Sequence, residues 1–268
     1  MEKYLKSNKK LWNELTKLHQ EKNNLYSIND FRSGKTTLSK TEINELGDIS
    51  GKKILHLQCH FGLDSLSLAK MGARVTGVDF SEESIKLANH LNKESKLSVK
   101  FICADLYDLP EILNGKFDIV FTSYGVLLWL PDLNRWAKII SHFLKSKGLF
   151  YIIEGHPFSM ILENKGKGIN LFVKKSYFHN SPVKEKRGRD YANPKQQLKN
   201  TAYTWNHPIS EVINSLVREG LKIDFLHEFP YSCEAHYNNM ELKKEGWWFK
   251  GKREIIPMMF SLRATKEK

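Results

Sequence analysis

The sequence is poor in cysteine and contains no long apolar run. Its three cysteines, Cys59, Cys103 and Cys233, are scattered and form neither a C-x-x-C pair nor an even set. This usage argues against a disulfide framework and a zinc site, and it is typical of a reducing compartment. No apolar stretch approaches the roughly 20 residues that cross a bilayer, and the first residues do not resemble an export signal. We therefore predict a cytoplasmic protein with no bound metal and no membrane partner.

Acidic residues are fewer than basic ones, and the difference is concentrated in one segment. The chain carries 42 Lys and Arg against 30 Asp and Glu, for a net charge of +12. Residues 54–156 hold eleven of each sign, whereas residues 157–207 hold ten basic and three acidic side chains. Such a segment can steer an anionic substrate or nucleic acid, or it can be an ordinary lysine-rich surface. The second interpretation is simpler because no regular aromatic pattern accompanies the lysines.

Short apolar runs alternate with helical patterns between residues 51 and 156. Strands are predicted at 53–58, 74–79, 98–103, 117–123 and 149–154. Helices are predicted at 63–71, after an N-cap at Ser81, and from Pro131 to Leu144, with Gly148 ending the last one. This alternation is typical of a parallel sheet, so we predict an α/β fold.

The segment before this core predicts helices. Leu11, Leu15, Leu18 and Leu25 follow helical spacing over residues 10–24, and a second short helix is predicted at 41–47. We therefore predict an N-terminal helical cap over residues 1–50.

The pattern lapses after residue 156 and returns after residue 207. Strand-like runs at 170–179 and 201–205 flank the basic stretch 184–189, and we predict an inserted lid over 157–207. A helix at 209–219 and strands at 221–229 and 256–265 then complete a core made of residues 51–156 and 208–268. The aromatic run Trp247-Trp248-Phe249 looks exposed and is interpreted as an interface or a lid anchor.

One strand and the turn after it carry the main functional signal. Residues 54–62 read Ile-Leu-His-Leu-Gln-Cys-His-Phe-Gly, an apolar strand that breaks into a turn, and Asp79 follows Gly62 by seventeen residues. The backbone amides of such a turn can face a ligand, and a carboxylate after the next strand can bind two ribose hydroxyls. Gln58 and His60 stand where glycines are usual. A pyrophosphate-binding dehydrogenase needs those glycines, so the pattern argues against that class.

Together with these residues, Ala104-Asp105-Leu106 after the third strand and Phe117-Asp118-Ile-Val in the fourth complete a recognisable order. The chain resembles the class I S-adenosylmethionine-dependent methyltransferases, closely over 51–155 and in element order over 208–265. Its loop resembles that of an uncharacterised bacterial branch with the sequence Leu-His-Leu-Gln-Cys-His-Phe-Gly. The resemblance implies a Rossmann-like, seven-stranded, mostly parallel sheet with an antiparallel last strand.

The resemblance also implies a cofactor and its site. The cofactor would be S-adenosylmethionine, which leaves as S-adenosylhomocysteine. The implied cofactor-binding residues are Gln58, Cys59, His60, Gly62, Asp79, Phe80, Ala104, Asp105, Leu106, Ser123 and Tyr124. His56 departs from the acidic residue common in the family's first strand. The side chains of Gln58 and His60 could bind the methionine part of the cofactor or could hold the loop to the N-terminal cap.

Candidate catalytic residues lie where strands end. His156 is the first choice for a base because imidazole titrates near neutral pH, and Glu154 and Tyr124 are further candidates. Trp129, Tyr203, Trp205 and His207 are candidates for contacting the acceptor, although aromatic residues beside strand ends often only pack.

The function predicted from these features is transfer of a methyl group to a small-molecule acceptor by in-line displacement. One alternative is an RNA or DNA methyltransferase, but Ser123-Tyr124-Gly125-Val126 stands where such enzymes commonly carry Asn/Asp-Pro-Pro-Tyr/Phe. A second alternative is a protein that binds the cofactor without catalysis. The sequence leaves the oligomeric state open.

Overall fold

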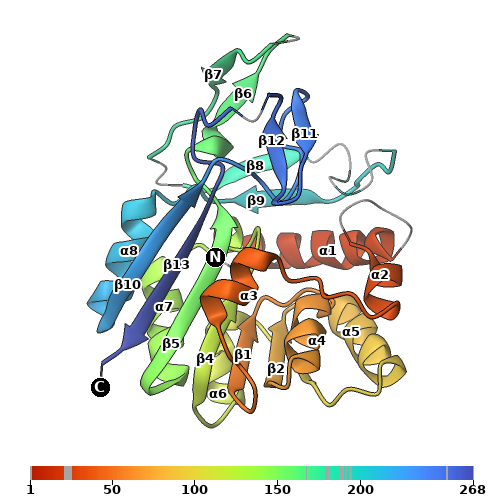
Figure 1. The fold of residues 1–268 in the computed structure, drawn as a ribbon, viewed down its shortest axis with the longest axis vertical. Coiled ribbons are helices and arrows are strands. Elements are labelled where there is room, and N and C mark those ends of the chain that lie inside the picture. Colours follow the sequence, from red (N-terminus) through yellow and green to blue (C-terminus); the bar gives the residue numbers. More distant parts are fainter. Residues whose placement is uncertain are drawn as a thin grey trace.

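A seven-stranded sheet forms the centre of the computed structural model, in the order β10-β13-β5-β4-β1-β2-β3 (Figure 1). The structure describes residues 2–20, 26–166, 168–178, 181–186, 190, 192, 195–251 and 253–267. The strands are β1 (Lys53–Leu57), β2 (Arg74–Asp79), β3 (Lys100–Cys103), β4 (Phe117–Thr122), β5 (Leu144–Gly155), β10 (Leu221–Phe229) and β13 (Met259–Lys266). Strands β1 to β5 pair in parallel, and β13 is antiparallel to both β5 and β10. The predicted Rossmann-like sheet with an antiparallel last strand is confirmed.

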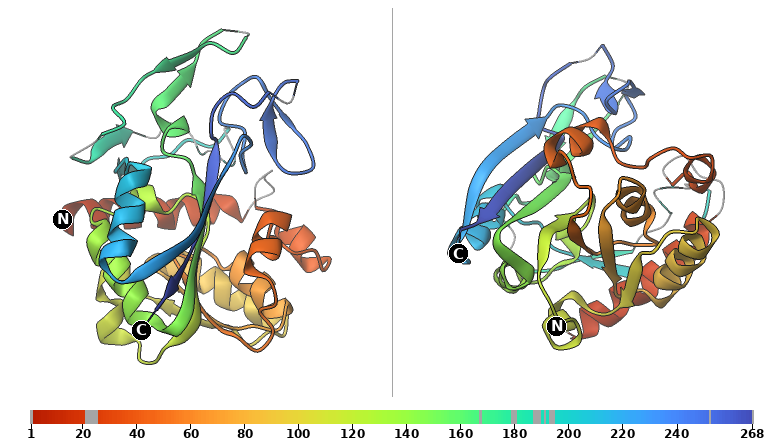
Figure 2. Two further views of the ribbon diagram at one scale, coloured as in Figure 1. Left: turned by 60° about the vertical axis from the view of Figure 1, so that its left-hand side comes forward. Right: turned by 60° about the horizontal axis from the view of Figure 1, so that its bottom comes forward.

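Helices cover both faces of this sheet (Figure 2). The helices α6 (Leu109–Ile112), α7 (Leu133–Phe143) and α8 (Ile209–Arg218) pack on one face, and α3 (Lys40–Leu46), α4 (Leu63–Lys70) and α5 (Glu82–Glu94) on the other. On β5, Phe150 and Ile152 join the first core cluster, while Tyr151 and Ile153 join the second. Alternate side chains of a strand point to opposite faces, so a strand buried on both sides reads as a continuous apolar run.

The predicted core elements agree with the structure except around α7. This helix begins at Leu133, not at Pro131, and Asp132 is its N-cap, with a side chain that accepts a hydrogen bond from the backbone N of Arg135 at 3.0 Å. The helix ends at Phe143, and Gly148 lies inside β5 instead of ending the helix. A Cβ atom at Gly148 would lie 2.9 Å from the carbonyl oxygen of Lys145, so the tight bend there requires glycine.

The N-terminal cap contains three helices. Helix α1 spans Glu2–His19, so it begins and ends earlier than the predicted 10–24, and Leu25 lies outside the described residues. A short helix, α2 (Ile28–Arg32), was not predicted, whereas α3 matches the prediction within one residue and carries a Ser39–Glu42 capping box. Helix α1 packs against α5 and β9 (Thr201–Thr204) across the carboxyl edge of the sheet (Figure 1).

Three short hairpins lie beyond the same edge (Figure 1). Two come from residues 157–207, where β6 (Leu162–Asn164) pairs with β7 (Leu171–Val173) and β8 (Val183–Lys186) pairs with β9. The predicted runs at 170–179 and 201–205 correspond to β7 and β9, and part of the basic stretch, residues 187–189, lies outside the described residues. Across the described ranges, no helix is both long enough and apolar enough to span a membrane.

The third hairpin was not predicted. Strands β11 (Met240–Leu242) and β12 (Trp247–Phe249) arise between β10 and β13. The aromatic run that looked exposed in the sequence is largely interior, since Trp248 is 5% exposed and Phe249 is fully buried. The core strands β10 and β13 are therefore separated by a segment that reaches the same edge as α1.

Candidate active site

A cavity of about 600 Å³ opens at the carboxyl edge of the parallel strands. Open α/β sheets bind ligands at this edge because the loops after the parallel strands converge there. Helix α1 and the segments 157–207 and 230–258 contribute further walls. The predicted site residues that line the cavity are Gln58, Cys59, His60, Gly62, Asp79, Phe80, Ala104, Asp105, Leu106, Ser123, Tyr124, Trp129, Glu154, Trp205 and His207.

The loop after β1 keeps the backbone of a glycine loop although it has few glycines. Gln58 has φ of 54°, His60 of 50° and Gly62 of 78°, all in the left-handed region. A residue with a side chain costs roughly 1–2 kcal/mol in this conformation, so such strain persists only where the surroundings enforce it. At Gly62 an added Cβ would also lie 2.5 Å from the ring of Phe101, so glycine is required there for space as well.

Asp79 fastens this loop to the end of β2. One carboxylate oxygen accepts a hydrogen bond from the backbone N of His60 at 2.9 Å, and the other accepts one from the backbone N of Ser81 at 2.9 Å. Each carboxylate oxygen has two lone pairs, so both can accept a further donor from the cavity. Burial raises the pKa of Asp79 to about 6, although the backbone amides around it oppose the rise.

The side chains of Gln58 and His60 point to different partners. Gln58 Nε2 donates to the carbonyl of Val126 at 3.2 Å, while its buried Oε1 has no partner within the described residues. The His60 ring lies 3.0 Å from Ser84 Oγ through Nδ1 and 3.0 Å from His19 Nδ1 through Nε2. Burial, with a smaller effect of His19, lowers the pKa of His60 well below its usual value. His60 therefore joins the loop to α1 and α5 as a neutral ring.

His56 lies in β1, at the position where the resemblance implies an acidic residue. Its Nδ1 lies 2.8 Å from Ser65 Oγ in α4, and its Nε2 lies 3.4 Å from Ser123 Oγ after β4. Complete burial lowers the pKa of His56 to about 3, so the ring is neutral at physiological pH. His56 supports the floor of the site by holding α4 and the end of β4 to β1.

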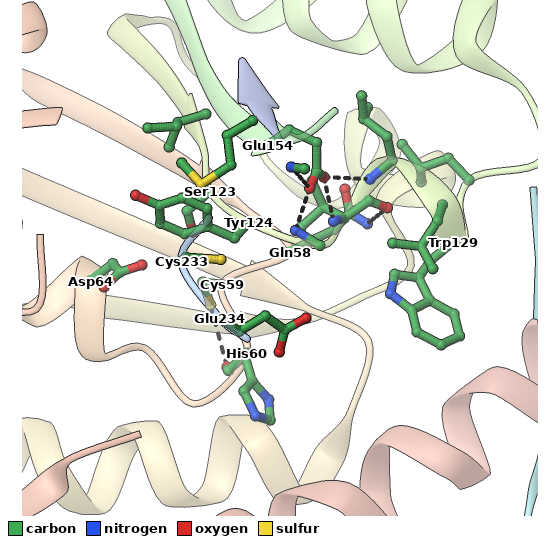
Figure 3. Close-up of a pocket in the computed structure, with 18 of the residues that line it drawn as sticks. Gln58, Cys59, His60, Asp64, Ser123, Tyr124, Trp129, Glu154, Cys233 and Glu234 are labelled. Carbon is green, nitrogen blue, oxygen red and sulfur yellow. Dashed lines mark hydrogen bonds between the residues drawn. The ribbon is translucent and has the colours of Figure 1, made fainter. Parts of the chain in front are cut away.

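Glu154 holds the loop after β4 (Figure 3). Its Oε1 accepts hydrogen bonds from the backbone N of Gly125 and of Gly155, both at 2.6 Å. Its Oε2 accepts from Val126 at 2.7 Å and from Leu127 at 3.1 Å. Burial raises the pKa of Glu154, and these four amides oppose the rise. The carboxylate is thus occupied in shaping the loop that carries Tyr124 and Trp129.

Comparison with known proteins agrees with this arrangement. Residues 54–148 match the family model described as a methyltransferase domain. This segment is thus similar to a methyltransferase domain, and the whole chain has the fold of class I S-adenosylmethionine-dependent methyltransferases. A ubiquinone biosynthesis O-methyltransferase of Coxiella burnetii is 33% identical over 144 residues, which are 54% of this chain and 57% of that protein. The chain spans about half the length of the curated relatives it matches.

Solved structures show the same fold. An S-adenosylmethionine-dependent methyltransferase of Mesorhizobium loti aligns over 90% of this chain and all of that chain, with a TM-score of 0.60 and 18% identity. A magnesium protoporphyrin IX methyltransferase of Synechocystis, solved with bound S-adenosylhomocysteine, aligns over 94% and 93% with a TM-score of 0.53 and 14% identity. At these identities the likeness concerns the fold.

In this methyltransferase fold, His156 lies away from the cavity. Its Nδ1 accepts a hydrogen bond from the backbone N of Phe158 at 3.1 Å, and its Nε2 lies 2.9 Å from Glu228 Oε1 on β10. Burial lowers the pKa of His156, while Glu228 opposes this. His156 is not among the residues that line the cavity, so it is not placed to take a proton from a ligand there.

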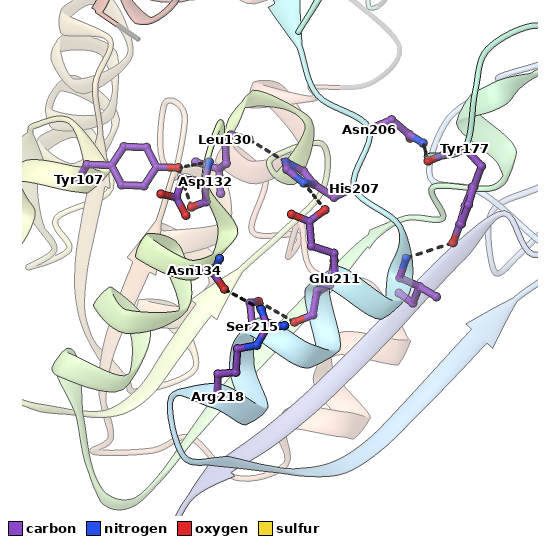
Figure 4. Close-up of polar contacts among 12 residues, drawn as sticks. Tyr107, Leu130, Asp132, Asn134, Tyr177, Asn206, His207, Glu211, Ser215 and Arg218 are labelled. Atoms are coloured by element: carbon purple, nitrogen blue, oxygen red, sulfur yellow. Dashed lines mark hydrogen bonds and ion pairs between the residues drawn. The ribbon is translucent and has the colours of Figure 1, made fainter. Parts of the chain in front are cut away.

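Tyr203 and His207 have structural contacts. The Tyr203 ring packs against Tyr4 with centroids 4.8 Å apart, and Tyr203 lies outside the cavity lining. His207 lines the cavity, but its Nε2 lies 2.7 Å from the carbonyl of Leu130 and its Nδ1 lies 3.0 Å from Glu211 Oε2 (Figure 4). His207 therefore ties the start of α8 to the loop before α7.

The structure adds lining residues that sequence reasoning missed. They come from the N-terminal cap, the first turn of α4 and the segment after β10, and include Thr37, Ser39, Thr41, Asp64, Tyr231, Cys233, Glu234 and His236. Asp64 directly follows the Gln-Cys-His-Phe-Gly-Leu loop, so its position in the sequence was a usable signal. The residues after β10 carry no such signal, because only tertiary contacts bring residues 231–236 to this edge.

Proposed function

We propose that the chain is an S-adenosylmethionine-dependent methyltransferase that acts on a small-molecule acceptor. The observation that carries this proposal is the strained loop 58–62 bound to the carboxylate of Asp79 at one wall of the cavity. A volume of about 600 Å³ falls within the range of roughly 300–1,000 Å³ typical of small-molecule sites.

The residues of the cavity fit this cofactor. Asp79 keeps acceptor capacity for two ribose hydroxyls, and the unpartnered Oε1 of Gln58 suits a ligand donor. Ala104, Asp105 and Leu106 lie at the end of β3, on the wall that would take the adenine. When bound, S-adenosylmethionine would supply a methyl group on a cationic sulfur, which is already activated for transfer. The protein then has to align the acceptor and exclude water.

The segments that cover the cavity serve to exclude water from it. Trp12 of α1 lies edge-on to Trp129 with ring centroids 5.3 Å apart, and the backbone N of Trp205 donates to the carbonyl of Leu128 at 2.8 Å. We propose that α1, residues 157–207 and residues 230–258 together form the lid, which extends the predicted one. A partly covered site of this volume favours a small molecule over a polymer as the acceptor.

A base is needed only if the acceptor loses a proton during transfer. Burial, with the nearby Glu42, raises the pKa of Tyr124 well above its usual value, so the phenol stays protonated and donates to Glu42 at 2.9 Å. The pair Glu234 and His236 lines the cavity, with Oε1 and Nδ1 3.5 Å apart. We propose this pair as the proton acceptor, in place of His156.

Isothermal titration calorimetry with S-adenosylmethionine and S-adenosylhomocysteine tests the proposed function. We expect both to bind the wild type, and Asp79→Ala to weaken binding by more than about tenfold, because paired hydrogen bonds to a charged group are lost. Asp108→Ala, which removes an exposed carboxylate near the end of β3, is the matched control and should bind normally. Absence of binding of both compounds to the wild type would refute the proposal.

A further inference from the structure

One wall of the cavity is rich in hydroxyl and carboxyl groups that the cofactor loop does not use. It is formed by the segment before α3, the first turn of α4 and the loop after β4, and its lining residues are Thr37, Ser39, Thr41, Asp64, Ser123 and Tyr124. Asp64 and Tyr124 lie on the same side of the cavity, away from Trp129 (Figure 3). The Asp64 end of this wall therefore lies at the opposite end of the cavity from the Trp129 side chain.

Asp64 is held in place by hydroxyl groups. Its Oδ1 accepts a hydrogen bond from Thr37 Oγ1 at 2.6 Å, and Thr37 Oγ1 lies 2.9 Å from Ser67 Oγ one turn further along α4. The carboxylate thus has a fixed orientation at the cavity wall. Burial raises its pKa, and these hydroxyl contacts oppose the rise.

Glu42 lies behind this wall and is fully buried. Its Oε2 accepts hydrogen bonds from the Tyr124 hydroxyl at 2.9 Å and from the backbone N of Ser39 at 2.7 Å. Its Oε1, also buried, has no hydrogen-bond partner in the described part of the chain. Burial, and then the charge of Asp64, raises the pKa of Glu42 to about 8. Two carboxyl groups therefore oppose each other's ionisation beside the cavity.

Lys40, the nearest basic residue in the sequence, is exposed, and three other basic side chains are engaged elsewhere. Lys35 pairs with Asp30 at 2.8 Å, Arg32 pairs with Glu94 at 2.7 Å, and Lys70 donates to the carbonyl of Phe31 at 2.9 Å. Buried carboxylates are normally paired with a cation or hydrogen-bonded throughout. The wall thus has the acceptors to receive a cationic donor from a ligand, with Asp64 as the carboxylate that lines the cavity.

We propose that this wall is a subsite for the protonated amine of a ligand, with Asp64 as its carboxylate and the Glu42–Tyr124 pair behind it. An ammonium group has three donors, which suits a carboxylate flanked by the hydroxyls of Thr37 and Ser123. The inference rests on the proposed function, which supplies two sources of such an amine. One is the amino group in the methionine part of the cofactor, and the other is an amine-bearing acceptor.

Calorimetry with two related compounds separates these sources. S-adenosylhomocysteine carries the amino group, whereas 5′-methylthioadenosine shares the adenosine and the sulfur but lacks the amino-acid part. If the cofactor is the source, Asp64→Asn should weaken the binding of S-adenosylhomocysteine roughly tenfold or more. The same substitution should leave the affinity for 5′-methylthioadenosine unchanged. Unchanged binding of 5′-methylthioadenosine also shows that the adenosine half of the site has folded.

If the acceptor is the source, Asp64→Asn should leave both nucleosides unchanged. The wild type saturated with S-adenosylhomocysteine should then bind tyramine more tightly than its neutral counterpart 4-ethylphenol, and Asp64→Asn should remove the difference. Glu42→Gln, which keeps the shape of the buried side chain, should reduce the difference in affinity between tyramine and 4-ethylphenol by a smaller amount. Asp30→Asn, which removes an exposed carboxylate of α2, is the control. It should change neither the affinity for the nucleosides nor the affinity for tyramine.

The outcomes that overturn the inference are distinct from those that overturn the proposed function. A wild type that binds both nucleosides, with Asp64→Asn unchanged towards the nucleosides and towards tyramine, overturns the amine subsite alone. An Asp64→Asn variant that loses both nucleosides equally also overturns it, because the effect would then be structural. A wild type that binds neither S-adenosylmethionine, S-adenosylhomocysteine nor 5′-methylthioadenosine overturns both.

Discussion

Gln58 and His60 show that residues with side chains can hold the left-handed backbone of a tight loop. Their φ are 54° and 50°. His60 gains two ring contacts, to Ser84 and His19, while Gln58 gains one longer hydrogen bond to Val126. The left-handed backbone therefore costs both residues a similar free energy. The two contacts of the His60 ring offset more of this cost than the single hydrogen bond of Gln58 does.

This difference predicts the effect of restoring glycine. His60→Gly should lower the free energy of unfolding by at least about 1 kcal/mol more than Gln58→Gly, because it leaves buried polar partners without a hydrogen bond. Urea unfolding of both variants beside the wild type measures the difference. Equal losses would mean that the ring contacts of His60 contribute no net stability.

Asp79 predicts a pH dependence of nucleoside binding. Its pKa of about 6 lies above the usual value of 3.8, so the carboxylate gains a proton as the pH falls through 6 and then loses acceptor capacity. Affinity for S-adenosylhomocysteine should fall between pH 7.5 and pH 5. Because 5′-methylthioadenosine has the same ribose, its affinity should fall in parallel. Asp79→Asn should flatten both profiles, and calorimetry across this range would show an unchanged slope if another group were responsible.

At the scale of elements, one carboxylate after a strand organises the loop after its neighbour. Glu154 ends β5 and accepts hydrogen bonds from Gly125, Val126 and Leu127 after β4, as well as from Gly155. The sequence suggested Glu154 as a catalytic group, and the contacts instead show a group that positions a loop. The same arrangement explains why Gly125, with φ of 73°, can turn sharply there.

Replacement of Glu154 should therefore affect the fold and the site together. Glu154→Gln presents an NH₂ group to backbone donors, so at least one hydrogen bond is replaced by a clash of donors. We expect a loss of about 2–4 kcal/mol in the free energy of unfolding, with weaker cofactor binding. Glu228→Gln, at the more exposed carboxylate beside His156, is the control. A variant with normal stability and binding but no turnover would instead identify Glu154 as a base.

At the scale of the whole molecule, segments far apart in the sequence cover one edge of the sheet. Helix α1, the β8–β9 hairpin and the β11–β12 hairpin all lie beyond the carboxyl ends of the parallel strands (Figure 1). The side chain of Asn8 in α1 donates to the carbonyl of Tyr203 at 2.8 Å and accepts from its backbone N at 2.8 Å, which joins two of these segments. The covering segments α1 and β9 are thus bonded to each other as well as to the core.

This connection predicts a shared response to ligand. Amide hydrogen exchange in α1 and β9 should slow together with that in the 58–62 loop when S-adenosylhomocysteine binds, since the cover and the loop share the His19–His60 contact. Helix α7, none of whose residues lines the cavity, should be nearly unaffected. Slowing confined to the 58–62 loop and the end of β2 would show that the cover does not respond.

The order of the core elements could be predicted because hydrophobic periodicity and capping act between near neighbours. Strand β2 and the Ser81 cap matched the prediction. The helix after β4 was less accurate because Pro131 and Gly148 are each compatible with more than one local structure. The side chain of Asp132 and the crowding at Lys145 decided between them.

The part of the cavity wall at the ends of β1, β2 and β3 could also be predicted, since parallel strands in sequence order bring their carboxyl ends together. The part formed by residues after β10 could not. His156 follows the end of β5, where strand alternation stops, so its direction depends on Glu228 from a distant strand. Residues 231–236 and 240–249 enter the site only because the chain between β10 and β13 folds back over the sheet. Local pattern thus accounts for the strands, the helices and the position of Asp79, and long-range packing accounts for which side chains line the cavity.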